Sequence, residues 1–247
     1  MRIDVVFGAA LAASDVSGRV VGVIDVLRAS TSIAVALANG ARAVIPLESS
    51  EDVVNRAKTL ERGDVRLAGE RRMLPVPGFD FGNSPREFTR EAVEGKTILM
   101  TTTNGTPAIA NTPGARDVVI ASYVNYSAVL TMLGTALRGG TDITLVCAGR
   151  ERQFALEDAA CAGRYVHQVS KRLSGVAVND AAQACALIDR KYGDQILRLF
   201  EASEHGRALR DAGFGDDLAV CAALDSYPVI PLYQDRQITK LGPDRER

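Results

Sequence analysis

The run Arg19-Val20-Val21-Gly22-Val23-Ile24-Asp25 decides the fold class of this chain. Between its charged ends it is apolar throughout, so it lacks the alternation of a strand that has one face in water. Uninterrupted apolar runs of this length are typical of central strands in a parallel sheet, which helices cover on both faces. Residues 19–25 therefore predict a buried strand of an α/β protein.

Strand and helix patterns alternate from this strand to about residue 150. Parallel strands need crossover connections, and the crossover helices cover the sheet. The alternation therefore predicts three layers, α/β/α, around a mostly parallel sheet. The expected strands are residues 43–46, 65–68, 96–100, 117–121 and 142–147. The expected helices are residues 30–39, one capped by Ser50 and stopped by Gly63, one beginning near Ser84, one beginning near Pro107 and one through residues 129–137.

The sequence becomes richer in helix patterns after about residue 150. Residues 155–224 are mostly helical in pattern, and the runs 229–232 and 237–241 predict closing strands. A chain of 247 residues forms either one elaborate domain or two small ones. We expect a single α/β unit over residues 1–247, with any division near residue 150. The alanine-rich helical part also offers an apolar surface for a homodimer.

Composition and charge exclude several classes of protein. Hydrophobic residues make up 47% of the chain and charged residues 24%, as in ordinary globular proteins. The 29 basic and 30 acidic residues nearly cancel and tryptophan is absent, so neither a positive field nor a base-stacking surface favours nucleic acid. The amino terminus has no signal-peptide pattern, and no uncharged apolar run could span a bilayer. We expect a cytoplasmic protein without a nucleic-acid or membrane partner.

The four cysteines and two histidines show no metal-binding spacing. Cys147, Cys161, Cys185 and Cys221 lie far apart in apolar segments without a CxxC pair, so we expect them to be reduced and buried. Among the histidines, His167 falls within a helix pattern, whereas His205 lies in a more polar stretch.

Polar residues follow several expected strands at their carboxyl ends, where open parallel sheets bind ligands. These residues are Asp25, Glu70, the loop 101–106 and the pair Glu157-Asp158. Four arginines near these ends either contact an anionic substrate or lie in solvent, and they are Arg71, Arg72, Arg150 and Arg152.

The loop Thr101-Thr102-Thr103-Asn104-Gly105-Thr106 joins a strand to a helix. Helix amino termini present free N–H groups, glycine permits close approach, and threonine hydroxyls donate to phosphate oxygens. The loop therefore predicts one wall of a phosphate site. The alternative is a capped turn whose threonines bond to one another. We expect Thr103, Asn104, Gly105 and Thr106 to face the ligand.

Asp25 ends an otherwise apolar strand, where its carboxylate is costly to bury without a cation, hydrogen bonds or solvent. An ion pair with Arg28 would satisfy it without any further function. Otherwise Asp25 ligates magnesium or acts as a nucleophile, while Arg28 clamps a phosphate group. The hydroxyls of Ser30 and Thr31, which follow directly, are then further phosphate-binding groups.

Carboxylates are the residues that magnesium prefers, together with water and substrate phosphate. Asp25, Glu70, Glu157 and Asp158 are therefore the candidate magnesium ligands. For Glu157 and Asp158 the alternative is complementation of a helix dipole in a first turn.

Residues 78–85 form a glycine-punctuated loop that leads into a helix. Such a loop predicts either an anion nest of backbone amides, with Asn83 and Ser84 as substrate-binding residues, or a lid or plain turn.

Common signatures of phosphate chemistry are missing. The chain has no G-x-x-x-x-G-K-[ST] loop and no G-x-G-x-x-G after the first buried strand. No cysteine is followed by an arginine six positions later in a phosphate loop, and Asp25 has no second aspartate two residues on.

Several short sequence motifs of this chain, in the same order and with similar spacing, resemble those of one family, 2-phosphosulfolactate phosphatase. Where that family often has Arg-Ala-Thr-Thr, this chain has Arg28-Ala29-Ser30-Thr31, which retains the hydroxyl. The strings that carry the resemblance are Ile24-Asp25-Val26-Leu27-Arg28-Ala29-Ser30-Thr31, Asn39-Gly40-Ala41, Gly69-Glu70, Gly78-Phe79-Asp80, Gly82-Asn83-Ser84-Pro85, Thr101-Thr102-Thr103-Asn104-Gly105-Thr106, Cys147-Ala148-Gly149, Leu156-Glu157-Asp158 and Ala162-Gly163.

The resemblance implies a magnesium-dependent acid phosphatase that converts 2-phosphosulfolactate to sulfolactate on the route to coenzyme M. Its nucleophile would be either water or Asp25 through an acyl phosphate. Two rivals remain at this point: a noncatalytic sensor of a phosphate ester or carboxylate, and a phosphotransferase with an acceptor other than water.

Overall fold

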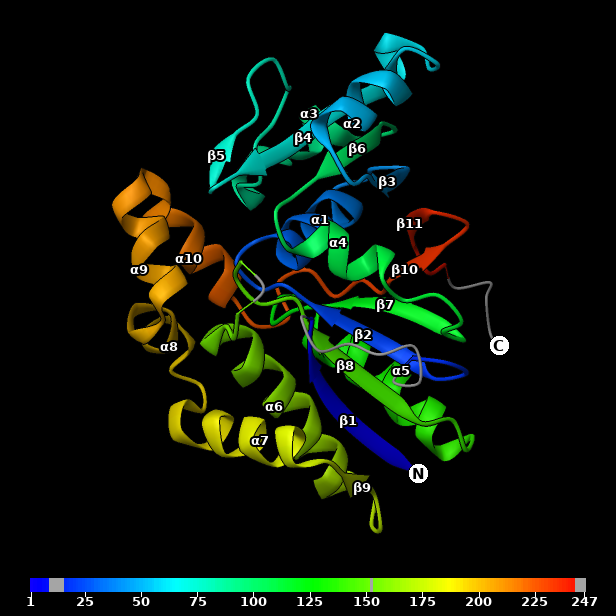
Figure 1. Ribbon diagram of the computed structural model, residues 1–247, viewed down its shortest axis with the longest axis vertical. Coiled ribbons are helices and arrows are strands. Elements are labelled where there is room, and N and C mark those ends of the chain that lie inside the picture. Colours follow the sequence, from blue (N-terminus) through cyan, green and yellow to red (C-terminus); the bar gives the residue numbers. More distant parts are fainter. Residues whose placement is uncertain (9–15, 152, 243–247) are drawn as a thin grey trace.

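The computed structural model describes residues 1–8, 16–151 and 153–242 of the chain. The described residues form a sheet of 11 strands with helices on both of its faces (Figure 1). The predicted α/β fold, with three layers and a mostly parallel sheet, is confirmed. Arg152, one of the four arginines considered above, lies outside the described residues.

Two parallel sets of strands, joined by an antiparallel hairpin, make up the sheet. In order across the sheet, the strands are β5 (Leu74–Pro75), β4 (Val65–Arg71), β6 (Thr97–Thr101), β3 (Ala43–Pro46), β11 (Gln237–Lys240), β10 (Pro231–Gln234), β7 (Asp117–Ala121), β2 (Val20–Ile24), β8 (Ile143–Cys147), β1 (Arg2–Phe7) and β9 (Ala177–Val178). One parallel set runs from β4 to β3 and the other from β7 to β9. The hairpin of β10 and β11 lies antiparallel between them.

The helices cover the sheet in the amino-terminal part and become dominant after β8, as the sequence predicts. The α-helices are α1 (Ala29–Ala38), α2 (Ser50–Ala57), α3 (Arg90–Val93), α4 (Gly105–Ala110), α5 (Tyr126–Arg138), α6 (Leu156–Arg172), α7 (Asp180–Tyr192), α8 (Ile196–Ala202), α9 (Glu204–Leu209) and α10 (Gly215–Ala222). Short turns of other helix types are η3 (Arg62–Asp64), η4 (Pro85–Glu87) and η5 (Arg210–Phe214). Figure 1 shows α8, α9 and α10 stacked at one side of the molecule, between β5 and α7.

Strand β2 is buried along its whole length because both of its faces carry helices. Val21 and Val23 belong to one core cluster with side chains of α1 and α4. Val20 and Ile24 belong to the other, with side chains of α5 and α6. Alternate side chains of a strand point to opposite faces of the sheet. The uninterrupted apolar run 19–25 is thus explained by a three-layer core.

Some predicted boundaries were wrong. Helix α2 has Ser49 rather than Ser50 as its N-cap, because the Ser49 hydroxyl accepts the Asp52 N–H while the Asp52 carboxylate accepts the Ser49 N–H. This helix also ends at Ala57, before Gly63. The helix expected near Ser84 is only the single turn η4, capped by Ser84.

Helices α6 and α7 approach each other closely at Gly163. A Cβ atom at this position would lie 1.9 Å from the carbonyl oxygen of Cys185. Because that atom belongs to the backbone of α7, only a separation of the two helices could relieve the contact.

Gly163→Ala is therefore expected to lower the free energy of unfolding by about 1–3 kcal/mol. The matched control is Gly134→Ala in α5, where the added Cβ would meet Arg138 at an ordinary 3.5 Å. Since alanine favours a helix over glycine, this control is expected to gain up to about 1 kcal/mol. Urea denaturation measures both changes, and a Gly163→Ala protein as stable as the wild type would contradict the close packing.

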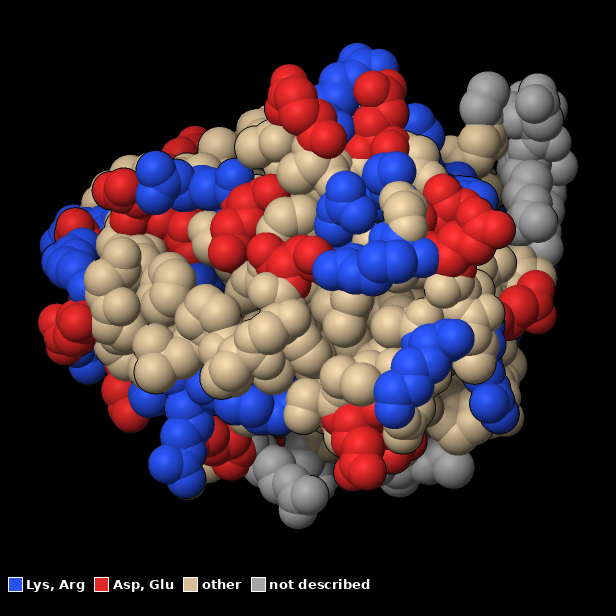
Figure 2. Space-filling model, turned by 90° about the horizontal axis from the view of Figure 1, so that it is seen from above, with Lys and Arg blue, Asp and Glu red and all other residues tan. Residues whose placement is uncertain are grey.

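The distribution of surface charge and the state of the cysteines are as expected from the sequence. Acidic and basic side chains lie next to one another over the face shown in Figure 2, as expected from nearly balanced charges. Cys147, Cys161, Cys185 and Cys221 are buried free thiols. Among the described helices, none combines the length and apolarity needed to cross a membrane.

Candidate active site

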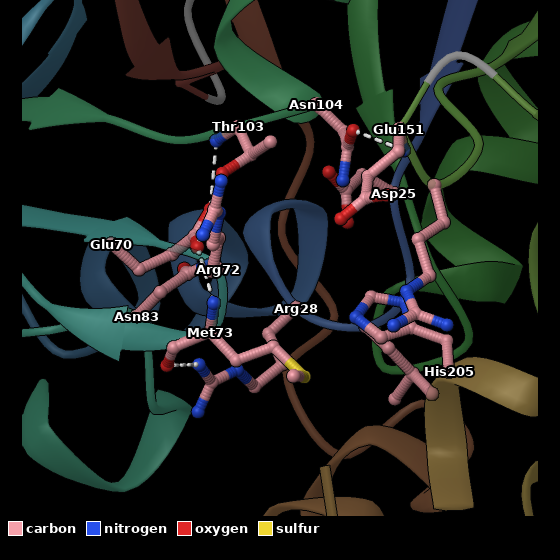
Figure 3. Close-up of a pocket in the computed structure, with 12 residues that line it drawn as sticks. Asp25, Arg28, Glu70, Arg72, Met73, Asn83, Thr103, Asn104, Glu151 and His205 are labelled. Carbon is pink, nitrogen blue, oxygen red and sulfur yellow. Dashed lines mark hydrogen bonds between the residues drawn. The ribbon is translucent and has the colours of Figure 1, made fainter. Parts of the chain in front are cut away.

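A cavity of about 230 Å³ lies beyond the carboxyl ends of β2, β4, β6 and β8. In Figure 3, Glu70 and Asn83 lie on one side of this cavity, and Asp25, Asn104 and His205 lie on the other. Strands from both parallel sets therefore supply the site, and α9 contributes His205. The 12 lining residues are Asp25, Leu27, Arg28, Glu70, Arg72, Met73, Asn83, Thr103, Asn104, Arg150, Glu151 and His205.

Asp25 follows β2 directly and is 6% exposed. Its Oδ1 accepts the backbone N–H of Ala29 at 3.3 Å. A Cβ at Gly105 would lie 2.7 Å from Asp25 Oδ2, so glycine allows the threonine-rich loop to approach this carboxylate. Burial raises the pKa of Asp25 to about 6, with the nearby Glu70 charge adding to the increase and His205 opposing it. Titratable groups perturbed in this way are common at functional sites.

Glu70, in β4, is held by the loop that was expected to bind phosphate. The Thr103 backbone N–H donates to Glu70 Oε1 at 2.7 Å, and the Thr103 hydroxyl donates to Oε2 at 3.2 Å. The Met73 N–H also donates to Oε2, at 2.8 Å. Three donors therefore fix the carboxylate of Glu70 at the edge of the cavity.

Arg28 does not pair with Asp25. Its Nη1 donates to Asp217 Oδ2 at 2.7 Å, and both side chains of this ion pair are 2% exposed. Its Nη2 donates to the Met73 carbonyl at 2.9 Å, and the guanidinium lies 4.3 Å from the centre of the Phe214 ring. The sequence offered an ion pair between Arg28 and Asp25 as an alternative, but Arg28 pairs with Asp217 of α10 instead. The Asp25 carboxylate therefore has no arginine partner in the part of the chain that the structure describes, and it lines the cavity.

Several predicted substrate-binding hydroxyls are used to hold the backbone instead. The Ser30 hydroxyl accepts the Asp25 N–H, and the Thr31 hydroxyl donates to the Val26 carbonyl. Thr106 exchanges hydrogen bonds with Thr102, as in the capped turn considered as the alternative. The Ser84 hydroxyl donates to Asp217 at 2.6 Å. None of Ser30, Thr31, Ser84, Gly105 and Thr106 lines the cavity, so we leave them out of the proposed site.

Glu157 and Asp158 are not among the lining residues of this cavity, although Glu157 lines an adjoining one. The oxygens of Asp158 accept the backbone N–H groups of Val26 and Gly149 at 2.9 and 3.0 Å, which ties β2 to the loop after β8. Burial raises the pKa of Asp158 well above its usual value, and the charge of Asp25 adds to the increase. Glu157 Oε1 lies 3.0 Å from Nδ1 of His205. Both oxygens of Asp158 are thus used by the backbone, whereas Glu157 Oε2 is buried without a hydrogen-bond partner among the described residues, so that Glu157 as a magnesium ligand stays a prediction from the sequence.

Comparison with known proteins gives a consistent result. The family described as 2-phosphosulpholactate phosphatase matches residues 9–236. A protein of Symbiobacterium thermophilum is 40% identical over 229 residues, which is 93% of this chain and 97% of the relative. A Clostridium botulinum protein is 34% identical over 98% of this chain and 100% of its own length. A Gloeobacter violaceus protein is 40% identical over 84% of this chain and 85% of its own length. All three are named "Probable 2-phosphosulfolactate phosphatase".

The chain belongs to the 2-phosphosulfolactate phosphatase family. The family and the names of these relatives place it among phosphoric monoester hydrolases. The resemblance stated from the sequence motifs is confirmed. The motif residues Asp25, Glu70, Asn83, Thr103 and Asn104 lie around one cavity.

Four lining residues were not predicted from the sequence as site residues, namely Leu27, Met73, Glu151 and His205, and His205 is the titratable group that lies farthest along the chain. It is 180 positions from Asp25 in the chain numbering, and no local motif connects the two. The polar context of His205 was the only signal. Arg72 and Arg150 also line the cavity, whereas Arg71 bonds to the hydroxyl of Thr101.

The family resemblance implies magnesium, and the donor set of the cavity fits this ion. Asp25 and Glu70 bring two carboxylates to one small cavity, where a cation would relieve their repulsion. The Oδ1 atom of Asn83, another lining residue, is buried without a hydrogen-bond partner among the described residues. Over the described part of the chain, no three His, Cys, Asp or Glu side chains are grouped to hold a metal. Water and substrate would therefore complete the coordination, as is usual for magnesium.

The raised pKa of Asp25 predicts how stability depends on pH in the metal-free protein. Unfolded Asp25 loses its proton near pH 3.8, whereas in the folded protein its pKa is about 6. Between these values the folded state binds more protons, so the contribution of Asp25 to stability falls as pH rises. Below this window the contribution is zero, and above it the full penalty remains.

We therefore expect metal-free wild-type protein to lose stability relative to Asp25→Asn as pH rises from about 4 to about 6. Urea denaturation of both proteins at several pH values measures the difference. A difference that stays constant across this window would mean that Asp25 titrates normally in the folded protein.

Proposed function

We propose that this protein hydrolyses the phosphate ester of a small acid with the help of magnesium, and that its substrate is 2-phosphosulfolactate. The products are sulfolactate and phosphate. The observation that carries the proposal is the pair of buried carboxylates, Asp25 and Glu70, which face one cavity beside Arg28. A protein that only binds anions gains nothing from two such carboxylates unless a cation neutralises them. The names of the relatives support the choice of substrate.

Asp25 and Glu70 would hold the magnesium ion, with the amide oxygen of Asn83 as a further donor. When bound, the ion supplies charge neutralisation and polarises the phosphoryl oxygens. Glu70 is already fixed by the N–H groups of Met73 and Thr103, so its carboxylate does not have to reorganise when substrate arrives.

Arg28 and Asn104 would orient the phosphate group. Asp217 and the Met73 carbonyl hold the Arg28 guanidinium in one position. Because arginine carries five N–H donors, these bonds leave donors for a phosphate oxygen. The Asn104 Oδ1 accepts the Glu151 N–H at 2.9 Å, which fixes the amide and leaves its NH₂ group as a donor.

We further propose that the reaction takes place in the cytoplasm and supplies sulfolactate for coenzyme M. The absence of a membrane-crossing helix among the described residues is compatible with this location. A homodimer, and a single unit over residues 1–247, stay predictions from the sequence.

A panel of phosphate esters tests the substrate. Phosphate release is measured with 2-phosphosulfolactate, 2-phospholactate and glycerol 2-phosphate at fixed magnesium. We expect kcat/KM to be highest for 2-phosphosulfolactate, and equal reaction of glycerol 2-phosphate, which has no second anionic group, would contradict the proposed substrate. Transfer of phosphate to an added alcohol in preference to water would identify a phosphotransferase instead.

A further inference from the structure

A second cavity, of about 410 Å³, adjoins the candidate active site. The two cavities share three lining residues, Arg150, Glu151 and His205. The rest of the second cavity is lined by residues 153–157 and by the junction of α8 and α9, and its charged residues there are Arg207, Glu157 and Glu204. A ligand that lies against Arg150 can therefore have one end in each cavity.

Arg150 is held much less firmly than Arg28. Its Nη1 donates to Glu204 Oε1 at 2.7 Å, but the side chain of Glu204 is 85% exposed while that of Arg150 is 25% exposed. An ion pair with so exposed a partner contributes only about 0–1 kcal/mol. Arg28, by contrast, has a partner with a 2% exposed side chain. Arg150 can thus exchange Glu204 for an anionic ligand at little cost.

The proposed substrate needs such a partner. A phosphorylated small acid carries at least one anionic group besides its phosphate, and 2-phosphosulfolactate carries a carboxylate and a sulfonate. The phosphate would lie beside Asp25, Glu70 and Arg28 in the first cavity. Asp25 and Glu70 would repel a second anionic group in the first cavity, whereas the second cavity offers two guanidiniums, those of Arg150 and Arg207, beside its own carboxylates.

We propose that Arg150, at the junction of the two cavities, binds the carboxylate or sulfonate end of the substrate and so selects phosphorylated acids over phosphate esters that have no second anionic group. This inference rests on the proposed function. Arginine suits the role because its planar guanidinium donates two parallel hydrogen bonds to a carboxylate or a sulfonate. Glu204 occupies the guanidinium until substrate displaces it and then remains in solvent.

The test compares 2-phospholactate with its carboxamide, which keeps the phosphate and the size but loses the second charge. Arg150→Met is expected to lower kcat/KM for 2-phospholactate by about 10- to 100-fold, the value of one charge-assisted contact. Its kcat/KM for the carboxamide is expected to change less than about threefold, since no ion pair is lost. Equal losses for both esters, or no loss for either, would overturn the proposal.

Two further variants sharpen the comparison. Glu204→Gln removes the competing carboxylate and is expected to raise kcat/KM for 2-phospholactate by up to about fivefold. A decrease would mean that Glu204 positions Arg150 rather than competing with substrate, and would overturn the exchange. Arg210→Met is the matched control, because Arg210 pairs with Glu201 and lines neither cavity. This variant is expected to treat both esters as the wild type does.

A binding measurement without hydrolysis tests the role of Arg150 separately from the proposed hydrolytic function. Calorimetry with sulfolactate, which carries no phosphate, is expected to show weaker binding to Arg150→Met than to the wild type. If the wild type releases no phosphate from either ester, the proposed function fails, but weaker sulfolactate binding by the variant would still support the anion subsite. Unchanged sulfolactate binding would overturn it.

Discussion

Replacing Asp25 by asparagine is expected to abolish magnesium-dependent phosphate release while the protein stays folded. Asparagine keeps the size of the side chain but loses the charge that would hold the ion at the end of β2. Loss of this group is expected to lower kcat by about 10²- to 10³-fold, the scale found when one preorganised electrostatic group is removed. The phosphate release rate at saturating substrate and magnesium measures the change.

The same substitution is expected to stabilise the metal-free protein at neutral pH. Asp25 is buried and its pKa is raised, so its ionised form costs free energy that a neutral amide does not. An inactive but more stable protein separates a functional role of Asp25 from a structural one. Active-site residues commonly lower the stability of a protein while they are needed for its activity.

Asp189→Asn is the matched control for this experiment. Asp189 is also a buried aspartate with a raised pKa, but it lies in α7 next to His167 and not at the cavity. Its replacement is expected to leave kcat unchanged. Magnesium-dependent turnover that persists in Asp25→Asn would remove Asp25 from the reaction.

Replacing Asp217 by alanine is expected to lower the free energy of unfolding by about 3–5 kcal/mol. The substitution leaves the buried guanidinium of Arg28 without its carboxylate and the Ser84 hydroxyl without its acceptor. Uncompensated buried charges are among the largest single causes of destabilisation. The double variant Arg28→Met with Asp217→Leu is expected to lose less, because it buries no charge. Urea denaturation measures each value.

The exposed ion pair between Arg150 and Glu204 provides the control. Glu204→Ala is expected to change the free energy of unfolding by less than about 1 kcal/mol, since the glutamate is largely in solvent. If Asp217→Ala also lowers the free energy of unfolding by less than about 1 kcal/mol, Arg28 has found water or another partner. The rigid placement of its guanidinium would then be wrong.

The order of the strands and helices could be predicted because short-range patterns determine it. The run 19–25 identifies a doubly covered strand, and β3, β7 and β8 follow the apolar runs closely. Asp25 and Glu70 could be singled out for the same reason, since a carboxylate at the end of a buried strand needs a partner. The resemblance of the motifs to a known family then indicated the type of reaction, hydrolysis of a phosphate ester.

The partners of these residues could not be predicted because they come from distant segments. His205 reaches the cavity from α9, Asp217 holds Arg28 from α10, and nothing near Arg28 or Asp25 in the sequence indicates either residue. The threonine-rich loop shows a second limit. A hydroxyl at a strand end can bind a ligand or the backbone equally well, and only the structure shows that Thr106 bonds to Thr102.

The most direct test of the central claim is a magnesium titration of phosphate release from 2-phosphosulfolactate, starting with protein stripped of metal by a chelator. We predict no release without magnesium, a saturable increase as magnesium is added, and one sulfolactate for each phosphate. Release that is the same with and without chelator would contradict the role of the carboxylates Asp25 and Glu70. Tight binding of the ester with no release at any magnesium concentration would identify a binding protein instead.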